Sequence, residues 1–235
     1  LVDNGGDAVI KSGVVSNREG YPLNSVFGLK YCGKIQTQDQ LDKYINQYAN
    51  GNNNIAMPGN LRLGDNMYED VNKDGKLTEA DYVYLGTDDP KVSFSFNAGL
   101  SWKGFDVSVI FQGAGKRTVW RGGENNQKGK NDNWRIPMMS WYNNSTNQSV
   151  GNVWSAETPN AHYPTYTHQT QINLYNYICS SWSVEDGAYL RLKNVTLGYT
   201  FPANVLSKTK FISYARIYVS GADLWENSKI KDGWD

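Results

Sequence analysis

The sequence predicts an all-β fold of antiparallel strands, and three observations support that prediction. Aromatic residues make up 13% of the 235 residues, and the chain contains 16 Tyr, 8 Trp and 23 Gly. This composition favours strands and loops over helix bundles. Two segments alternate apolar and polar residues with a period of two, as half-buried strands do. No uninterrupted apolar run reaches the roughly 18 residues that a membrane-spanning helix needs.

The clearest alternation lies in residues 91–113. Apolar side chains occupy every second position of Val92–Trp102, and small or polar residues lie between them. The dipeptide Lys103-Gly104 follows, and the alternation then resumes over Phe105–Phe111. Two alternating runs joined by two residues predict a tight antiparallel hairpin.

A second hairpin is predicted over residues 189–222. Alternating runs occur over Val195–Phe201 and Ala215–Ser220, and the connection, roughly residues 203–210, is short and mostly polar. The apolar residues just upstream of Val195 have the opposite parity. A single continuous strand therefore needs a bulge near Lys193-Asn194.

The rest of the chain is predicted to form loops. Residues 1–90 are loop-rich, with one short amphipathic helix that begins at Thr37, where Gln40 completes a capping-box spacing. Residues 114–188 show no sustained period and are rich in Asn, Gly, Trp and Tyr, and residues 223–235 begin a further loop. An internal loop as long as 114–188 is usually functional or disordered, and its aromatic content argues against disorder.

Both hairpins have features of membrane-spanning strands. Transmembrane strands are about 9–11 residues long, with an apolar outer face and aromatic residues at the membrane interfaces. Trp102 and Phe105 flank the first turn. Short connections at one end and long loops at the other also match outer-membrane barrels, in which periplasmic turns are short and extracellular loops are long.

The sequence therefore predicts part of the wall of a transmembrane β-barrel, with the small polar side chains facing a wet or plugged lumen. Four strands cannot close a barrel, which needs at least about eight, so the chain is expected to be a piece of a larger protein. A soluble β-sandwich or jelly roll, which would bury the apolar face under a second sheet, is the alternative that the pattern leaves open.

One segment has the spacing of a calcium-binding loop. In residues 70–81, oxygen-bearing side chains stand at positions 1, 3 and 5, a Gly stands at position 6 and an acid at position 12. An EF-hand-type loop requires this pattern, and its position 7 supplies a backbone carbonyl. The predicted ligands of a structural Ca²⁺ are Asp70, Asn72, Asp74, Lys76 and Asp81. The alternative is a metal-free turn held by Asx hydrogen bonds.

Several stretches of the chain carry a family resemblance. They are Glu19–Leu23, Phe27–Lys30, Asp70–Asp81 with Leu85-Gly86 and Pro90 after it, Gly104–Gly113, Trp182–Pro202 and Ile217–Leu224. Each is modest alone, but together they cover most of the chain in one order. In that order they resemble the C-terminal region of the SusC/RagA-like TonB-dependent outer-membrane transporters.

The resemblance implies a barrel of about 22 strands, of which this chain forms the C-terminal part, with a plug domain upstream. It implies localisation in the outer membrane of a Gram-negative bacterium, with the long loops exposed on the cell surface. It also implies three partners: a SusD-like surface lipoprotein that forms a lid, TonB, which acts through an upstream part of the protein, and an oligosaccharide or peptide substrate.

Aromatic side chains of the long loop are the candidate substrate-binding residues, because rings stack on sugar faces and peptide groups. Packing in a small loop core is the alternative for each of them. The candidates are Trp134, Trp141, Tyr142, Trp154, Tyr163 and Tyr166. For the protein as a whole, the alternative to a nutrient importer is a soluble, calcium-stabilised, β-rich glycan-binding module.

The charge balance and the missing motifs argue against nucleic-acid binding and catalysis. Lys and Arg number 23, and so do Asp and Glu, whereas nucleic acids select clustered Lys and Arg. The only histidines, His162 and His168, lie in one loop, and the chain has no nucleophile elbow, HExxH motif or phosphate loop. Cys32 and Cys179 form no CxxC pair, and two separate thiols are favoured over a disulfide. We therefore expect no enzyme.

Overall fold

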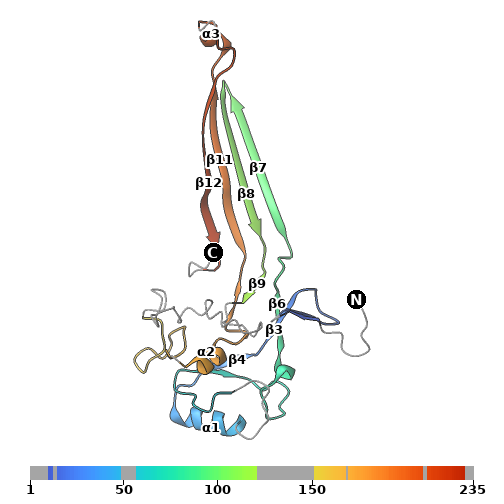
Figure 1. The fold of residues 1–235 in the computed structure, drawn as a ribbon, viewed down its shortest axis with the longest axis vertical. Coiled ribbons are helices and arrows are strands. Elements are labelled where there is room, and N and C mark those ends of the chain that lie inside the picture. Colours follow the sequence, from blue (N-terminus) through green and yellow to red (C-terminus); the bar gives the residue numbers. More distant parts are fainter. Residues whose placement is uncertain are drawn as a thin grey trace. The chain divides into compact units, whose positions relative to one another are not determined.

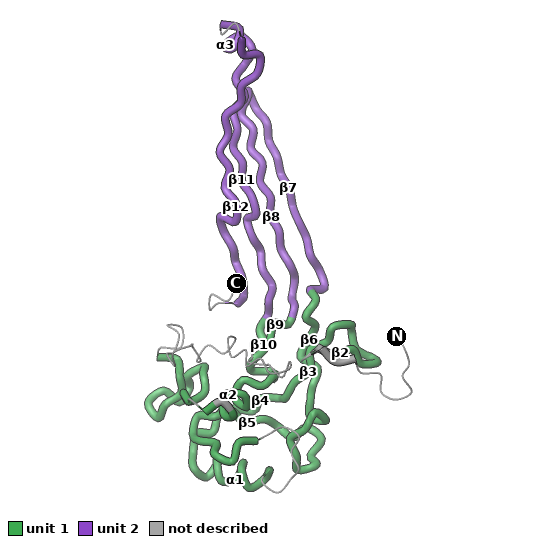
Figure 2. The backbone as a smooth tube through the Cα atoms, in the orientation of Figure 1, with its two compact units in different colours: residues 1–89, 118–185 green, residues 90–117, 186–235 purple. Residues whose placement is uncertain are grey.

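The chain divides into two compact units (Figure 2). The first comprises residues 1–89 and 118–185, and the second comprises residues 90–117 and 186–235. The computed structural model describes residues 10–12, 15–48, 57–120, 151–167, 169–208 and 211–230. No helix in these described ranges is long and apolar enough to cross a membrane.

The second unit is built on one four-stranded antiparallel sheet with the strand order β12-β11-β8-β7 (Figure 1). Its strands are β7 (Ser93–Trp102), β8 (Phe105–Ala114), β11 (Tyr189–Thr200) and β12 (Arg216–Ser228). A short helix, α3 (Ala203–Leu206), lies in the connection between β11 and β12. The strands of both predicted hairpins are therefore present, and the sheet joins the two hairpins through β8 and β11.

The turn between β7 and β8 is the two-residue turn that the sequence predicts. Trp102 pairs with Phe105, so only Lys103 and Gly104 lie between the strands. Both residues have positive φ values, 49° and 90°. Two consecutive positive φ values characterise a type I′ turn, whose twist matches that of the flanking strands.

The predicted bulge in β11 is confirmed, and its partner strand is longer than expected. The register of β11 shifts between Leu192 and Asn194 against both neighbours. Opposite this bulge, Asp223 has a φ of 50°, and beyond it β12 continues to Ser228 instead of ending at residue 222. Pairing resumes between Leu192 and Trp225. The irregular residues interrupt the alternation, which hides the continuation in the sequence.

The described residues of the first unit form short strands and three helical segments. One sheet contains, in order, β1 (Ile10–Ser12), β2 (Val15–Asn17), β3 (Ser25–Gly28) and β6 (Val83–Thr87). A second sheet pairs β4 (Tyr31–Lys34) with β5 (Asn66–Tyr68). A third sheet pairs β9 (Thr118–Trp120) with β10 (Val184–Asp186). The helices are α1 (Gln38–Tyr48), α2 (Thr170–Asn176) and the 3₁₀ turn η1 (Glu79–Asp81).

Helix α1 confirms the amphipathic helix predicted at Thr37. The Thr37 hydroxyl accepts a hydrogen bond from the Gln40 backbone N–H (3.3 Å), which caps the first turn. One face of the helix, with Leu41, Tyr44 and Tyr48, is buried in the core. The helix thus covers a core that other segments of the unit complete.

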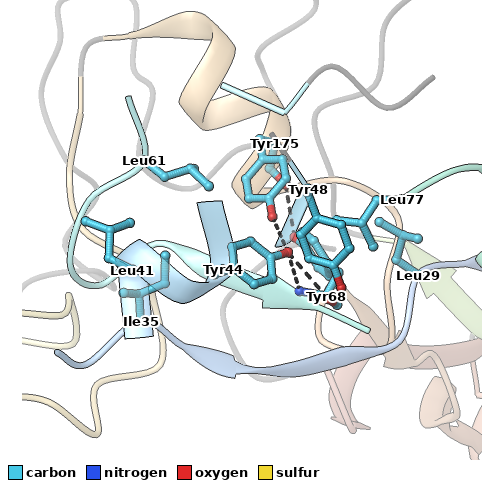
Figure 3. Packing of buried hydrophobic residues seen from close by; sticks show 9 residues of the cluster. All are labelled: Leu29, Ile35, Leu41, Tyr44, Tyr48, Leu61, Tyr68, Leu77 and Tyr175. Carbon is cyan, nitrogen blue, oxygen red and sulfur yellow. Dashed lines mark hydrogen bonds between the residues drawn. The ribbon is translucent and has the colours of Figure 1, made fainter. Parts of the chain in front are cut away.

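The core of the first unit joins distant segments through buried tyrosines (Figure 3). The hydroxyl oxygens of Tyr44 and Tyr175 lie 2.6 Å apart, and the Tyr68 backbone N–H donates to the Tyr44 hydroxyl (2.9 Å). The Tyr68 hydroxyl in turn donates to the Tyr175 carbonyl (3.0 Å). These bonds satisfy polar groups that would otherwise be costly to bury. The packed members are Leu29, Ile35, Leu41, Tyr44, Tyr48, Leu61, Tyr68, Leu77 and Tyr175.

Residues 114–188 differ from the sequence expectation of one aperiodic loop. Their described part forms β9, α2 and β10, and the segment that contains α2 supplies Tyr175 to the core of residues 1–89. Leu29 also forms a parallel bridge with Ser180. Helix α2 spans only seven residues, too few for a helical period to emerge from the sequence.

Candidate functional site

The sheet of the second unit has one apolar face. Residues that pair directly across antiparallel strands point to the same side, so the register fixes the membership of each face. Three rows of this face are Trp102–Phe105–Tyr199–Ile217, Leu100–Val107–Leu197–Val219 and Phe96–Phe111–Leu192–Trp225. We call the side that carries these rows the apolar face. Its side chains are open to the surroundings: Leu100 is 72% exposed and Trp102 is 66% exposed.

The dimensions of the apolar face match a membrane. Strand β7 has ten residues, which is about 33 Å of chain and, at a tilt of about 40°, about 25 Å along the membrane normal. An outward apolar band of about 25 Å is the height found in outer-membrane barrels. Soluble monomers rarely expose a contiguous apolar patch of this extent. The apolar face is therefore suited to contact the hydrocarbon chains of a lipid bilayer.

The opposite face of the sheet carries small and charged side chains. The Arg216 guanidinium bonds the Asp106 carboxylate through Nε (3.1 Å) and Nη2 (2.5 Å), and it reaches from β12 to β8 across Gly198 of β11. A Cβ at Gly198 would lie 2.5–2.7 Å from atoms of this pair, so the glycine leaves room for a bidentate bond. Arg191 also pairs with Glu226. We call this side the polar face.

The predicted calcium loop turns its side-chain oxygens onto its own backbone. Asp70 accepts from the N–H groups of Asp74 (3.2 Å) and Gly75 (2.7 Å). Asn72 accepts from the same Asp74 N–H (2.9 Å), and Asp74 accepts from the Lys76 N–H (2.8 Å). Gly75 has a φ of 79°, which makes the sharp turn expected at position 6.

Asp81 closes the loop from its far end. Its carboxylate is buried and accepts from the N–H groups of Val71 (3.0 Å), Asn72 (3.3 Å) and Thr78 (2.8 Å). The Thr78 hydroxyl accepts from the Ala80 N–H (3.2 Å), so Thr78 and Asp81 form a capping box on η1. Position 12 of the loop therefore has a structural role that is independent of any metal.

Whether the loop of residues 70–81 fits Ca²⁺ depends on the lone pairs that its carboxylate oxygens have left after bonding the backbone. Each carboxylate oxygen has two lone pairs, so the backbone bonds of Asp70, Asp74 and Asp81 leave acceptor capacity for a cation. Among the described residues, no group of three or more Asp, Glu, His or Cys side chains is close enough together to hold a metal ion. The observed bonds are those of an Asx-held turn, and calcium binding stays a prediction.

The aromatic candidates of the long loop fall into two groups. Trp134, Trp141 and Tyr142 lie outside the described residues. Trp154 donates its indole N–H to Gln36 (2.9 Å) and is partly exposed, as is Tyr166. Tyr163 is only 3% exposed and packs with Tyr177 in a small core. Loop-core packing therefore accounts for Tyr163, and substrate binding by the others stays a prediction.

Sequence reasoning missed an aromatic group around Trp182. The ring centroids of His162 and Tyr31 lie 5.3 and 6.3 Å from the Trp182 ring, and that of Tyr177 lies 5.4 Å away. His162 is exposed and Tyr31 is half-buried. Tyr31 lies more than a hundred positions from the other three residues, so no local pattern could have joined it to them.

The two cysteines are separate thiols, as the sequence favoured. Cys32 is exposed and Cys179 is buried, and the two thiols are not joined by a disulfide bond. Partial burial raises the pKa of the Cys32 thiol above its usual range, and the negative charge of Glu69 makes a smaller contribution in the same direction. A raised pKa disfavours the reactive thiolate.

The fold and the two faces of the sheet define a class: strand-rich proteins whose antiparallel strands carry one apolar face and one polar face. Solved structures of RagAB support this class. The "open-open" state of the RagAB peptide importer matches 99% of this chain and 22% of its own chain, with a TM-score of 0.63 and 17% identity. A structure of the RagAB peptide transporter matches 92% of this chain and 20% of its own, with a TM-score of 0.54 and 18% identity. At these identities the likeness shows the fold.

Two curated relatives carry the name TonB-dependent receptor. TonB-dependent receptor P3 of Formosa agariphila is 29% identical over 207 residues, which is 88% of this chain and 18% of the relative. TonB-dependent receptor P26 of the same organism is 26% identical, over 87% of the chain and 18% of the relative. The chain thus spans less than a fifth of their length. No protein-family model matches.

Together these similarities confirm the resemblance to the SusC/RagA-like TonB-dependent transporters. The names of these relatives and neighbours are those of receptors and importers, not of enzymes.

Proposed function

We propose that this chain supplies wall strands and a folded lobe to an outer-membrane nutrient importer. The observation that carries the proposal is the exposed apolar face, backed by a polar face, on four antiparallel strands of membrane-spanning length. A wall strand needs this division because it meets lipid on one side and an aqueous or plugged lumen on the other. The named relatives are TonB-dependent receptors, which supports this assignment.

For the partners and cargo, the proposal follows the family. Import would use energy delivered through TonB to an upstream part of the protein, and a SusD-like surface lipoprotein would act as the lid. The cargo class is an oligosaccharide or a peptide, and the structural neighbours are named as importers of peptides. Partly exposed rings of the first unit, such as Trp154 and Tyr166, are suited to stack on either kind of cargo.

We also propose a structural Ca²⁺ in the loop of residues 70–81, which would clamp the segment that leads into β6. The chelating oxygens would come from Asp70, Asn72, Asp74 and Asp81, with the carbonyl of Lys76. Asp81 and η1 hold one end of this loop in place without a metal, so the ion would add rigidity to the exposed end.

A soluble glycan-binding module is disfavoured by the same apolar face. Such a module would bury Leu100 and Trp102 in a closed core, whereas both side chains are mostly exposed.

The test uses the intact protein that contains this chain. Cells that carry the protein should take up a labelled oligosaccharide or a labelled peptide, and the protein should fractionate with the outer membrane. Removal of TonB should abolish uptake and leave the location unchanged. Recovery of the intact protein from the soluble fraction without detergent would refute the proposal.

A further inference from the structure

The connection between β11 and β12, residues 201–215, exposes an unusual number of large apolar side chains. Phe211 is 88% exposed and Tyr214 is 67% exposed, and Val205 and Ile212 are also exposed. A connection that lies in water normally presents polar residues. The described part of this connection is residues 201–208 and 211–215.

The described backbone of this connection is hydrogen-bonded at its ends and in α3, although most of its large apolar side chains are exposed. The Phe201 N–H donates to the Ala215 carbonyl (3.0 Å), so the hydrogen-bond ladder between β11 and β12 continues to the first and last residues of the connection. Helix α3 then forms one turn, in which the Ser207 N–H donates to the Ala203 carbonyl (2.8 Å), and Leu206 is buried. These bonds hold the two ends of the connection together and fix the turn that carries Val205.

A ladder of aromatic rings joins the connection to the apolar face. Trp102 and Phe105 pair at the end of the first hairpin. The Phe105 ring lies 4.6 Å from the Tyr199 ring, which lies 5.2 Å from the Phe201 ring at the base of the connection. Lys103 places its ammonium 4.8 Å from the Trp102 ring centroid. Rings beside a lysine at a strand end are typical of the membrane–water interface.

The surface is thus continuous from the strands to the turn beyond them. Within the second unit, α3 lies beyond the ends of the four strands (Figure 1). If hydrocarbon ends at the aromatic ladder, the residues beyond it lie at the level of the lipid headgroups. Apolar and amphipathic side chains such as Phe211 and Tyr214 partition favourably into that layer.

We propose that the described parts of this connection, residues 201–208 and 211–215, form an interfacial anchor that inserts Val205, Phe211, Ile212 and Tyr214 into the headgroup region of a phospholipid bilayer. The inference rests on the proposed function, because the strands must cross the bilayer for this connection to meet its surface. Lys208, which is exposed beside these residues, can extend its ammonium to water or phosphate while its stem lies on lipid. The anchor would fix the height of the β11–β12 hairpin in the membrane.

The test measures depth with spin labels on the intact protein. The protein, with Cys32→Ser to remove the exposed native thiol, is reconstituted in vesicles of phosphatidylethanolamine and phosphatidylglycerol at about three to one. Labels are placed at Phe211→Cys, at Leu100→Cys on the apolar face and at Asp42→Cys, an exposed position of α1. Collision with oxygen reports lipid, and collision with a water-soluble nickel chelate reports water.

The expected ratio of oxygen to nickel collision at Phe211→Cys is several-fold higher than at Asp42→Cys and lower than at Leu100→Cys. Asn204→Cys, at an exposed polar position of α3, should collide with nickel more often than Val205→Cys. A ratio at Phe211→Cys equal to that at Asp42→Cys overturns the anchor, as does a label shielded from both agents, which would indicate a protein partner. If Leu100→Cys itself behaves like Asp42→Cys, the proposed function fails instead.

Discussion

The two units of the chain place their apolar side chains in opposite ways. In the first unit, Leu29, Ile35 and Leu77 are completely buried around a hydrogen-bonded group of tyrosines. In the second unit, Leu100 and Trp102 lie on regular strands and remain mostly exposed. The first arrangement is stable in water, and the second is stable only where hydrocarbon replaces water. One chain therefore combines structures suited to two solvents.

The largest expected effect comes from a charge on the apolar face. Val109 lies mid-strand in β8 and pairs with Ala98 on one side and Val195 on the other. Val109→Arg should destabilise the inserted protein by about 2–4 kcal/mol, the cost of an arginine near the bilayer midplane. The measurement is the folded fraction of the intact protein in outer membranes, read from its gel mobility with and without heating.

The neighbouring residue supplies the matched control. Ser108 lies on the polar face and pairs with Gly99 and Thr196. Ser108→Arg places the same charge on the other side of the same strand, so it should leave insertion much less affected. Equal loss in the two variants would show that the faces do not differ in their surroundings.

A second prediction concerns the buried tyrosines of the first unit. Tyr44→Phe removes the hydroxyl that accepts from the Tyr68 N–H and meets the Tyr175 hydroxyl. The unpaired buried N–H should cost about 1–3 kcal/mol. Hydrogen exchange of the intact protein should speed up in α1 and β5 and stay unchanged in β8 and β11. Tyr84→Phe, which alters a partly exposed ring, should change little. Equal exchange in Tyr44→Phe and the unmodified protein would contradict this assignment.

The calcium proposal predicts a third difference between the units. Ca²⁺ at about ten times its dissociation constant should stabilise the first unit by about 1.4 kcal/mol and slow exchange in residues 70–81. Strands of the second unit should not respond. Calorimetry should show binding heat that is lost in Asp70→Ala/Asp74→Ala and kept in Asp39→Ala/Asp42→Ala, which alters exposed acids of α1. Equal heats in all three proteins would contradict calcium binding and indicate that residues 70–81 form a metal-free turn held by Asx hydrogen bonds.

The second unit was largely predictable because its signals are local. Each strand of the hairpin 93–114 shows its own alternation, the dipeptide Lys103-Gly104 defines the turn, and a change of parity locates the bulge. The fold of the first unit depends on distant partners, such as Tyr31 with Tyr68, which short irregular strands do not reveal. Its tyrosine core joins α1 to α2 across more than a hundred residues.

The candidate site shows the same division. The Asp70–Asp81 spacing correctly marks a loop of inward-turned oxygens, because the bonds that Asp70 and Asn72 accept span only a few residues. The capping role of Asp81 was also readable, since Thr78-x-x-Asp81 is a capping-box pattern before a helical turn. By contrast, the group around Trp182 requires the folded chain, and sequence alone could not separate buried Tyr163 from partly exposed Tyr166.

The smallest expected effect is a pH dependence confined to the first unit. Burial raises the pKa of the Asp65 carboxyl above its ordinary 3.8, and hydrogen bonds from the Asn176 amide and the Arg62 N–H partly offset that rise. The folded unit therefore binds the Asp65 proton more tightly than the unfolded chain does. Its free energy of unfolding should fall as pH rises from 3.8 through the raised pKa.

Asp65→Asn isolates this contribution because asparagine does not titrate. The stability advantage of the native protein over the variant should be greatest at the acid end of that window and shrink as pH rises. The measurement is the urea concentration at which half of the first unit is unfolded. Pulse proteolysis of the intact protein detects this midpoint. An advantage that grows with pH would mean that the bonds from Asn176 and Arg62 outweigh burial, and that the core of the first unit stabilises an ionised carboxylate.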